Sequence, residues 1–406
     1  MGFEPLTIGF DWEVGILNGD LSHYDDDAIY KEFALEVRRK YPMMPTGTDG
    51  PALLEHKSGI MRKWDELLER AIATDAEGRR IAKEKGAFYW PNGCSPLDDA
   101  VIGAHMHVGS MHSRTEAVLL RYAALPYMPA FIALMANSPT YRLEIGGWKS
   151  TRVHRSWVAE NAEGFTSPEC FVANRCGELN VWTWGKSTLE ARSIDSVTSP
   201  HLLCECLVFL AGFLAYLVDQ LAQEPREITQ EDYQRYLFNR FRACRHGLQA
   251  DFEWGEDGCI PVTQLLTQML EWAEPYIKTF DVSPADFTII PRMLEKRQNQ
   301  ADMMLVCATP LTDVYTAFYR YANLISTPDA FEEYLKVAPT LSSADASSPK
   351  DYILSRVQRD TRFWRLQELS HFSVKQLSQI LQELAAEGQI TVRQDVERGV
   401  LYSRAT

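Results

Sequence analysis

Two carboxylates near the start of the chain have the spacing of side chains that bind a cation together. Residues 7–17 alternate apolar side chains with Gly9, Asp11, Glu13 and Gly15. Side chains two positions apart share one face of a β-strand, so the two carboxylates would lie about 7 Å apart and repel each other unless a cation lies between them. The glycines would leave room for a ligand. The alternative interpretation is a sheet face that is open to solvent.

The same spacing of ionisable residues recurs in three later segments. The pairs are Glu55 with Lys57, His105 with His107, and Glu190 with Arg192. A single pair of this kind is usually a cross-strand ion pair or a hydrogen-bonded core residue. Four pairs in one chain favour a cavity that the strands share, and the alternative is that their faces belong to different sheets.

These residue types predict a site for a hard divalent cation. The carboxylates of Asp11, Glu13, Glu55 and Glu190 suit Mg²⁺ or Mn²⁺ better than Zn²⁺, and His107 would complete the set. Carboxylate-bound Mg²⁺ with arginines nearby is typical of phosphoryl transfer, because both neutralise phosphate charge. The sequence contains no Gly-x-x-x-x-Gly-Lys-Ser/Thr motif, which excludes a P-loop enzyme.

The composition is that of a folded, acidic protein. Of the 406 residues, 46% are hydrophobic and 24% are charged, and 41 basic against 55 acidic residues give a formal net charge of −14. A chain of this length can bury a large core and is expected to form more than one domain. The acidic balance argues against a general nucleic-acid-binding protein and against binding to an anionic membrane surface.

Neither a targeting segment nor a membrane span is expected. The N-terminal residues lack the basic and apolar regions of a signal peptide. The apolar stretch 202–218 contains Glu205 and is marginal for a span of about 20 residues, so it predicts a buried helix. The eight cysteines include no Cys-x-x-Cys pair, which argues against a zinc or redox motif. We therefore expect a cytoplasmic protein with free thiols.

One polar segment divides the chain. Residues 338–350, APTLSSADASSPK, predict a flexible linker between a body, residues 1–337, and a tail, residues 351–406. The body mixes short strands with helices. Its expected helices cover residues 113–125, 129–136, 202–221, 232–247 and 263–280.

The tail has the pattern of a winged-helix-like domain. The expected elements are a helix over 352–369, a helix over 373–388 and a hairpin over 390–402. The second helix carries Lys375 against Glu383 and Glu387, whereas a helix that reads DNA is basic. We therefore expect the helix to contact a protein or to pack within the fold rather than to bind nucleic acid.

The body resembles the glutamate–cysteine ligase type 2, or carboxylate–amine ligase, family of the glutamine synthetase-like superfamily. Five motifs follow in the family's order over about residues 5–300, and together they are specific although each alone is weak. They are Gly9-Phe-Asp-Trp-Glu13; His105-Met-His-Val-Gly109; Leu125-Pro with Ala133-Leu-Met-Ala-Asn-Ser-Pro139 and Gly147-Trp-Lys-Ser-Thr-Arg152; Thr188-Leu-Glu-Ala-Arg192 with Asp195; and the segment from Asn239 to Leu248.

The resemblance implies an α+β fold, in which a mostly antiparallel sheet backed by helices forms a cavity for metal and ATP. The metal ligands that it implies are Asp11, Glu13, Glu55, His107 and Glu190. It also implies catalytic contacts to phosphate or to a substrate carboxylate by Arg152, Arg192 and Arg245, with Asn137 and Ser150 lining or supporting the ATP site. The alternative for each arginine is a structural ion pair. Asp11 stands where the family usually has Glu, Lys57 is an extra cation, and the tail lies outside the family pattern.

The implied reaction joins a carboxylate, that of glutamate or another amino acid, to an amine through an acyl phosphate, with ATP and Mg²⁺ or Mn²⁺. The expected partners are amino-acid and amine substrates, a peptide or carrier protein bound by residues 351–406, and a second copy of the chain in a homodimer. Two alternatives stay open. One is an ATP-independent metallohydrolase in which His105, His107 and the carboxylates hold the metal. The other is an inactive ligase-like sensor or scaffold that acts through its tail.

Overall fold

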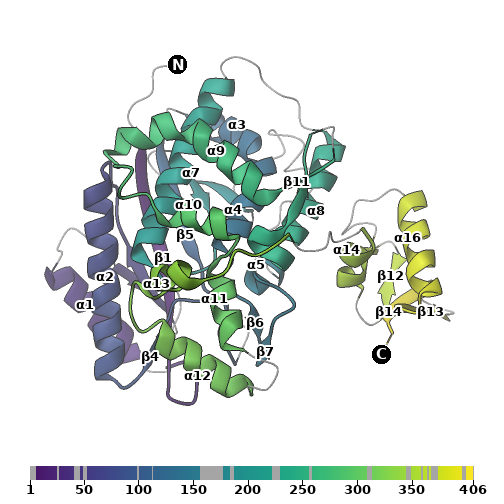
Figure 1. Ribbon diagram of the computed structural model, residues 1–406, viewed down its shortest axis with the longest axis horizontal. Helices are drawn as coiled ribbons and strands as arrows, with labels where there is room; N and C mark the ends of the chain where they lie inside the picture. The colour runs from purple at the N-terminus through teal and green to yellow at the C-terminus, as the bar shows by residue number, and fades with distance from the viewer. Residues whose placement is uncertain are drawn as a thin grey trace.

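The fold is seen in a computed structural model, in which the body and the tail are two separate masses (Figure 1). The described residues are 6–24, 27–40, 46–48, 53–97, 100–111, 113–155, 177–182, 187–221, 229–255, 258–308, 313–343, 349–357, 360–363, 365–366, 374–395 and 399–405. The expected α+β class with a mainly antiparallel sheet is confirmed.

A seven-stranded antiparallel sheet is the centre of the described body. Its order is β2-β3-β1-β5-β9-β8, and β4 pairs with the far end of β1. The strands are β1 (Thr7–Leu17), β2 (Thr46–Thr48), β3 (Leu53–Lys57), β4 (Phe88–Trp90), β5 (Ala104–Met111), β8 (Leu179–Trp182) and β9 (Ser187–Ala191). The four segments with paired ionisable residues are therefore β3, β1, β5 and β9, which are consecutive neighbours in one sheet.

The alternation in β1 gives the sheet an apolar face and a polar face. Ile8, Phe10, Trp12, Val14 and Ile16 are all at most 2% exposed and belong to the core. Helix α7 (Pro200–Leu221) contacts β1 and β5, and α3 (Arg114–Ala124) contacts β8 and β9 (Figure 1). Burying this apolar face drives the packing of the helices, which leaves Asp11 and Glu13 on the opposite face.

The expected body helices are present, with small differences in their ends. Helix α3 begins where Ser113 Oγ accepts a hydrogen bond from the Glu116 amide at 3.1 Å. The others are α4 (Met128–Met135), α7, α8 (Gln230–His246) and α9 (Val262–Ile277). A capping box between Thr229 and Asp232 starts α8.

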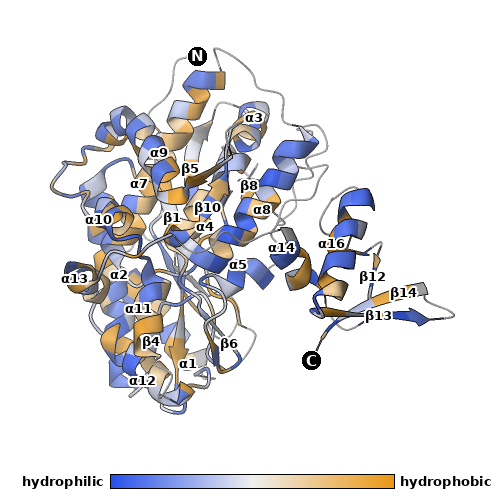
Figure 2. Cartoon of the chain, turned by 45° about the vertical axis from the view of Figure 1, so that its right-hand side comes forward, coloured by the Kyte–Doolittle hydropathy of each residue, from blue (hydrophilic) through white to orange (hydrophobic). Residues whose placement is uncertain are grey.

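Helix α7 is a core helix, as its Glu205 suggested. By length and apolar composition alone, residues 114–135 and 200–221 could each cross a membrane, but 83% of the apolar window in the second is buried within the protein. Figure 2 shows α7 among the other elements of the body. The carboxylate of Glu205 accepts hydrogen bonds from the backbone amides of Thr288, Ile289 and Ile290 at 2.8 to 3.1 Å.

The remaining body elements complete the layers around the sheet. They are α1 (Asp27–Lys40), α2 (Trp64–Glu84), β6 (Thr140–Tyr141), β7 (Glu144–Ile145), α5 (Thr151–Arg155), β10 (Asp251–Glu253), β11 (Cys259–Pro261), α10 (Ile289–Lys296), α11 (Gln300–Cys307), α12 (Val314–Leu324) and α13 (Ala330–Val337). The six cysteines in the described part of the chain are free thiols.

The tail contains most of its expected elements, but its first helix is shorter than predicted. Helix α14 (Pro349–Arg356) ends well before residue 369, and the prediction of one helix over 352–369 is wrong. Asp360 has a left-handed φ of 58°, which no right-handed helix accommodates, and the chain then pairs as β12 (Thr361–Arg362) with β14 (Gly399–Arg404). Helix α16 (Val374–Ala386) and the hairpin of β13 (Ile390–Asp395) with β14 agree with the sequence.

The winged-helix classification and the body–linker–tail division stay predictions. In the linker region, the Leu341 amide donates to the Lys296 carbonyl at 2.9 Å, and Arg297 donates to Ser343 Oγ at 2.5 Å. Residues 344–348 lie outside the described residues.

Candidate active site

The strand register brings the four ionisable pairs onto one face. Asp11 lies opposite Lys57 on one side and His105 on the other, and Glu13 lies opposite Glu55. On the next strand pair, His107 of β5 lies opposite Glu190 of β9. Because all these positions share the phase of the pleat, their side chains leave the sheet on the same side. The alternative of separate sheets is therefore wrong.

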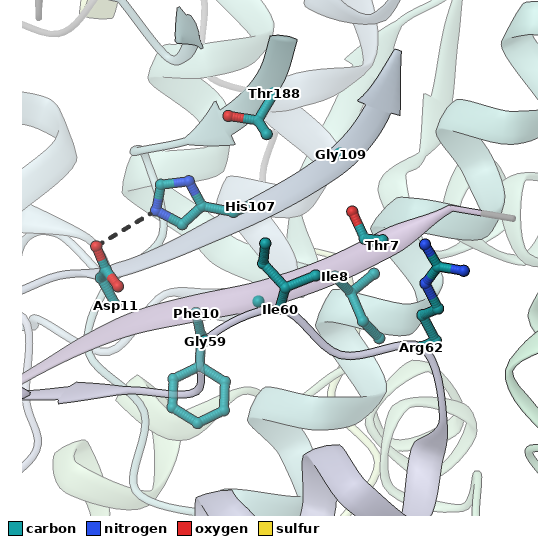
Figure 3. Close-up of a pocket in the computed structure, with 11 residues that line it drawn as sticks. Thr7, Ile8, Phe10, Asp11, Gly59, Ile60, Arg62, His107, Gly109 and Thr188 are labelled. Carbon is teal, nitrogen blue, oxygen red and sulfur yellow. Dashed lines mark ion pairs between the residues drawn. The ribbon is translucent and has the colours of Figure 1, made fainter. Parts of the chain in front are cut away.

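One half of this face is a cluster around Asp11. Lys57 Nζ lies 2.9 Å from Glu55 Oε2 and 3.6 Å from Asp11 Oδ2. His107 Nε2 lies 3.5 Å from Asp11 Oδ2, an ion pair that Figure 3 marks with a dashed line. Burial opposes the charged form of His107, but its hydrogen bond and ionic attraction to Asp11 outweigh burial and raise its pKa. Burial likewise opposes ionisation of Asp11, whereas His107 and Lys57 lower its pKa overall. Lys57 is thus the counter-ion between two of the predicted ligands.

The other half is a buried cluster around His105. Its Nδ1 lies 3.3 Å from Glu190 Oε1 and its Nε2 lies 3.9 Å from Glu13 Oε1. Glu13 Oε2 accepts the Gly103 amide at 2.6 Å, and Arg192 Nη1 lies 3.2 Å from Glu190. Burial and the charge of Arg192 hold the pKa of His105 well below its ordinary value, so its imidazole is neutral near neutral pH. His105 was not among the implied metal ligands, although its spacing from His107 had marked it.

The donor set fits a hard divalent cation in its chemistry. Carboxylate oxygens and neutral imidazole nitrogen are the ligands that Mg²⁺ and Mn²⁺ accept, and they lie together on one polar face. Within the described ranges, however, no three His, Cys, Asp or Glu side chains are placed closely enough around one point to hold a metal ion. The ligand set of Asp11, Glu13, Glu55, His107 and Glu190 therefore stays a prediction, and binding would require Lys57 and His105 to yield their contacts with the carboxylates.

Arg152 lies next to this face and is held by the backbone. Its Nη1 and Nη2 donate to the carbonyls of Ile194 and Arg192 at 3.1 and 3.0 Å, and Nη1 lies 3.8 Å from Asp195. Gly103 is required beside it, because a Cβ there would lie 2.2 Å from Arg152 Nη2. The position of Arg152 suits a residue that fixes the end of β9, from which Arg192 projects.

Asn137 and Ser150 belong to the support beneath Arg152. Asp195 is fully buried and accepts the Asn137 amide at 2.8 Å and Ser138 Oγ at 2.7 Å; burial raises its pKa. The Asn137 side chain donates to two backbone carbonyls, and Ser150 pairs with Ser138 as an isolated β-bridge. Asn137 and Ser150, which were predicted to line or support the site, are therefore buried residues that support Arg152.

Arg245 lies elsewhere. It is exposed near the end of α8, its guanidinium lies 5.2 Å from the centre of the Trp148 ring, and it donates to the Gly147 carbonyl. Within the described parts of the chain, Arg245 forms no ion pair with a carboxylate of the sheet face. The structure thus brings together Asp11, Glu13, Glu55, His107, Glu190 and Arg192, flanked by Arg152, and leaves Arg245 apart.

A cavity of about 350 Å³ adjoins the Asp11 cluster (Figure 3). Its lining residues are Thr7, Ile8, Gly9, Phe10, Asp11, Gly59, Ile60, Arg62, His107, Gly109 and Thr188. The sequence did not single out Arg62, Ile60 or Thr7, because nothing in their local pattern reveals a loop folded over β1. Gly9 does not make room for a ligand, since a Cβ there would lie 2.5 Å from the Gly59 carbonyl oxygen.

Sequence comparison supports the resemblance drawn from the motifs. The profile of the glutamate-cysteine ligase family 2 matches residues 92–163 and 178–307. A protein named "Putative glutamate–cysteine ligase 2" from Cronobacter sakazakii is 31% identical over 321 residues, which are 67% of this chain and 85% of that protein. The chain belongs to this family. A protein of the same name from an Acidovorax species is 25% identical over 331 residues, 70% of this chain and 86% of its own length.

Two solved structures are also similar at low identity. The ligase PafA in complex with the prokaryotic ubiquitin-like protein Pup matches with 13% identity and a TM-score of 0.47, over 98% of this chain and 87% of its own. GmaS without ligand matches with 13% identity and a TM-score of 0.38, over 70% of this chain and 69% of its own.

Proposed function

We propose that the protein is an ATP-dependent carboxylate–amine ligase that forms an amide through an acyl phosphate. The observation that carries this proposal is the register of β3, β1, β5 and β9, which gathers carboxylates, two histidines and Arg192 on one sheet face of a family member. Amino acids are the proposed source of the carboxylate, because the relatives are named as glutamate–cysteine ligases. ATP with Mg²⁺ or Mn²⁺ would be required.

The side chains of the face have distinct proposed roles. Asp11, Glu13, Glu55, His107 and Glu190 would hold the divalent cation, which, when bound, supplies positive charge to the ATP phosphates. Arg192 would neutralise charge on the transferred phosphoryl group, since its Nη1 already projects into the face beside Glu190.

The buried half of the face would keep water away from the reactive acyl group. Glu13, His105 and Glu190 are 5%, 8% and 2% exposed. The γ-phosphoryl group passes from ATP to the substrate carboxylate, which gives ADP and an acyl phosphate. The amine then attacks the acyl carbon and phosphate leaves, so the products are an amide, ADP and phosphate. Exclusion of water matters because water would otherwise hydrolyse the acyl phosphate.

The experiment is ADP release with ATP and Mg²⁺ across a panel of amino acids, amines and peptides. We expect release that depends on both a carboxylate and an amine, and Glu13→Ala or Glu190→Ala should abolish it while the circular dichroism spectrum is unchanged. Glu69→Ala is the matched control, because Glu69 is exposed on α2. Wild-type ADP release by a folded Glu13 variant would refute the proposal.

The same assay separates the two alternatives. A metallohydrolase built on His105 and His107 would turn over its substrate with metal but without ATP. A sensor or scaffold would bind nucleotide without releasing ADP under any combination of substrates.

A further inference from the structure

Arginines and aromatic rings gather on the body where it faces the tail. The imidazole of His154 stacks on the indole of Trp148, with 3.5 Å between ring centres, and the Arg245 guanidinium lies 5.2 Å from the same indole. Arg155, one residue further along α5, lies 3.7 Å from the centre of the Tyr141 ring and donates to its hydroxyl at 2.9 Å. Both guanidinium groups are exposed, although aromatic rings hold them in place.

The tail continues this surface with two more arginines. The ring of Tyr352 in α14 meets Phe241 of α8 edge-on at 5.4 Å, and Phe241 in turn meets Trp148 at 5.4 Å. Arg356 lies 5.4 Å from the centre of the Tyr352 ring. Arg404, at the end of β14, donates to a backbone carbonyl of α14 at 3.1 Å. Helix α14 therefore connects the tail to α8 (Figures 1 and 2).

The partly buried imidazole of His154 lies among these charges. Burial, reinforced by the guanidinium groups of Arg356, Arg240, Arg155 and Arg245, lowers the pKa of His154 to about 2. The arginines of the tail and of the body therefore lie close enough to act on one residue.

Among the described residues, few carboxylates offset these charges. Arg240 is neutralised by the buried Glu178, whose Oε1 lies 2.5 Å from its Nε. Asp351 and Arg404 both act on Arg245, Asp351 raising its pKa and Arg404, like burial, lowering it. Among the described residues of this surface, Arg155, Arg245, Arg356 and Arg404 therefore outnumber Asp351, which is an excess of positive charge in a chain whose net charge is −14.

We propose that Arg155, Arg245, Arg356 and Arg404, here called the junction arginines, bind an acidic peptide segment. A guanidinium fixed on an aromatic ring presents a planar pair of donors that matches a carboxylate. The junction arginines come from two parts of the chain and three of them are exposed, which suits an extended ligand with several carboxylates better than one small anion. The family profile ends at residue 307, so the tail adds two of these arginines to what the family shares.

A nucleic acid fits this surface less well. Glu383 of α16 and Glu387, just after this helix, pair with Lys350 at 2.8 and 2.6 Å and would repel phosphates. If the proposed ligase function holds, the peptide is a substrate or carries one; peptide binding itself does not depend on that function.

The test is the fluorescence anisotropy of a labelled, glutamate-rich peptide titrated with the full-length protein at low salt. We expect Arg356→Ala/Arg404→Ala to weaken binding about tenfold, since each charge pair at the protein surface contributes a factor of a few. Arg393→Ala is the matched control, because Arg393 is an exposed arginine on the hairpin that pairs with Asp360. Asp351→Asn should instead tighten binding, because it removes the opposing charge.

Several outcomes would overturn the proposal. Equal affinity of the double variant and the wild type for the peptide would do so. Displacement of the peptide by free glutamate or phosphate, at a concentration equal to that of the peptide's carboxylates, would also do so. Tighter binding of a single-stranded oligonucleotide than of the peptide would assign the surface to nucleic acid. ADP release with small amino acids should be unchanged in the double variant. Loss of ADP release in the Glu13 variant therefore tests the ligase function, and loss of peptide binding in the double variant tests the junction arginines separately.

Discussion

His56 is the side chain on β3 whose environment makes the sharpest quantitative prediction. It lies between Glu55 and Lys57 in sequence but points to the opposite, apolar side of the sheet. The rings of Trp12, Phe33 and Tyr89 surround it at 5.1, 4.8 and 6.1 Å between centres, and its Nε2 lies 2.9 Å from the Tyr89 hydroxyl. It is 1% exposed, and burial lowers its pKa from 6.5 to about 3.

The sign of the effect on stability follows from this pKa. Between about pH 6.5 and about pH 3, His56 is protonated in the unfolded chain but stays neutral in the folded protein. Lowering the pH through this range therefore favours unfolding. Taking these two pKa values, the loss between about pH 7 and about pH 5 is about 2 kcal/mol. His56→Gln removes the titration but keeps a polar side chain beside the Tyr89 hydroxyl.

The measurement is urea unfolding of both proteins at the two pH values. Other residues titrate equally in the two proteins, so they cancel in the difference between the free energies of unfolding. We expect this difference, wild type minus His56→Gln, to fall by about 2 kcal/mol on acidification. A difference that does not change with pH, or an imidazole that titrates near pH 6.5 by NMR in the folded protein, would refute this reasoning.

Two further predictions concern the support of the body and of the site. Glu205→Ala leaves three amides at the start of α10 without their acceptor, so the free energy of unfolding should fall by about 3 kcal/mol or more. Glu205→Gln should lower the free energy of unfolding by less. Equal stability of Glu205→Ala and wild type in urea unfolding would contradict this prediction. Gly103→Ala pushes a Cβ against Arg152 Nη2 and should lower ADP release about 100-fold. Gly19→Ala, at a position with nothing within 4 Å, is the control, and equal rates for the two variants would show that Arg152 tolerates displacement.

The strands of the site could be predicted because their chemistry coincides with their periodicity. The alternation of apolar and ionisable residues in Thr7–Leu17 identifies both the strand and its polar face. That Asp11 lies between Lys57 and His105 could not be predicted, because register depends on contacts between distant segments. Lys57 shows the consequence, since a residue that the spacing paired with Glu55 alone is the counter-ion of both Asp11 and Glu55.

Local patterns were less informative where distant contacts decide the structure. The helix expected from 352 to 369 ends at Arg356, because pairing of Thr361–Arg362 with β14 competes with helix continuation. Arg245 is part of a family motif, and the motif alone did not reveal that α8 directs it toward Trp148 and the tail. The helices α3 and α4 were predicted to within one residue at each end, whereas α9 ends three residues before the expected position.

The most direct test of the proposed reaction follows an oxygen atom. The carboxylate substrate found in the ADP-release panel is labelled with ¹⁸O, and the phosphate released on amide formation is analysed by mass spectrometry. Phosphoryl transfer to the carboxylate followed by attack of the amine must leave one carboxylate oxygen in the phosphate, so we predict one ¹⁸O atom in each phosphate formed. Phosphate that carries no ¹⁸O from the carboxylate, while ADP is still released, would contradict the acyl-phosphate ligase.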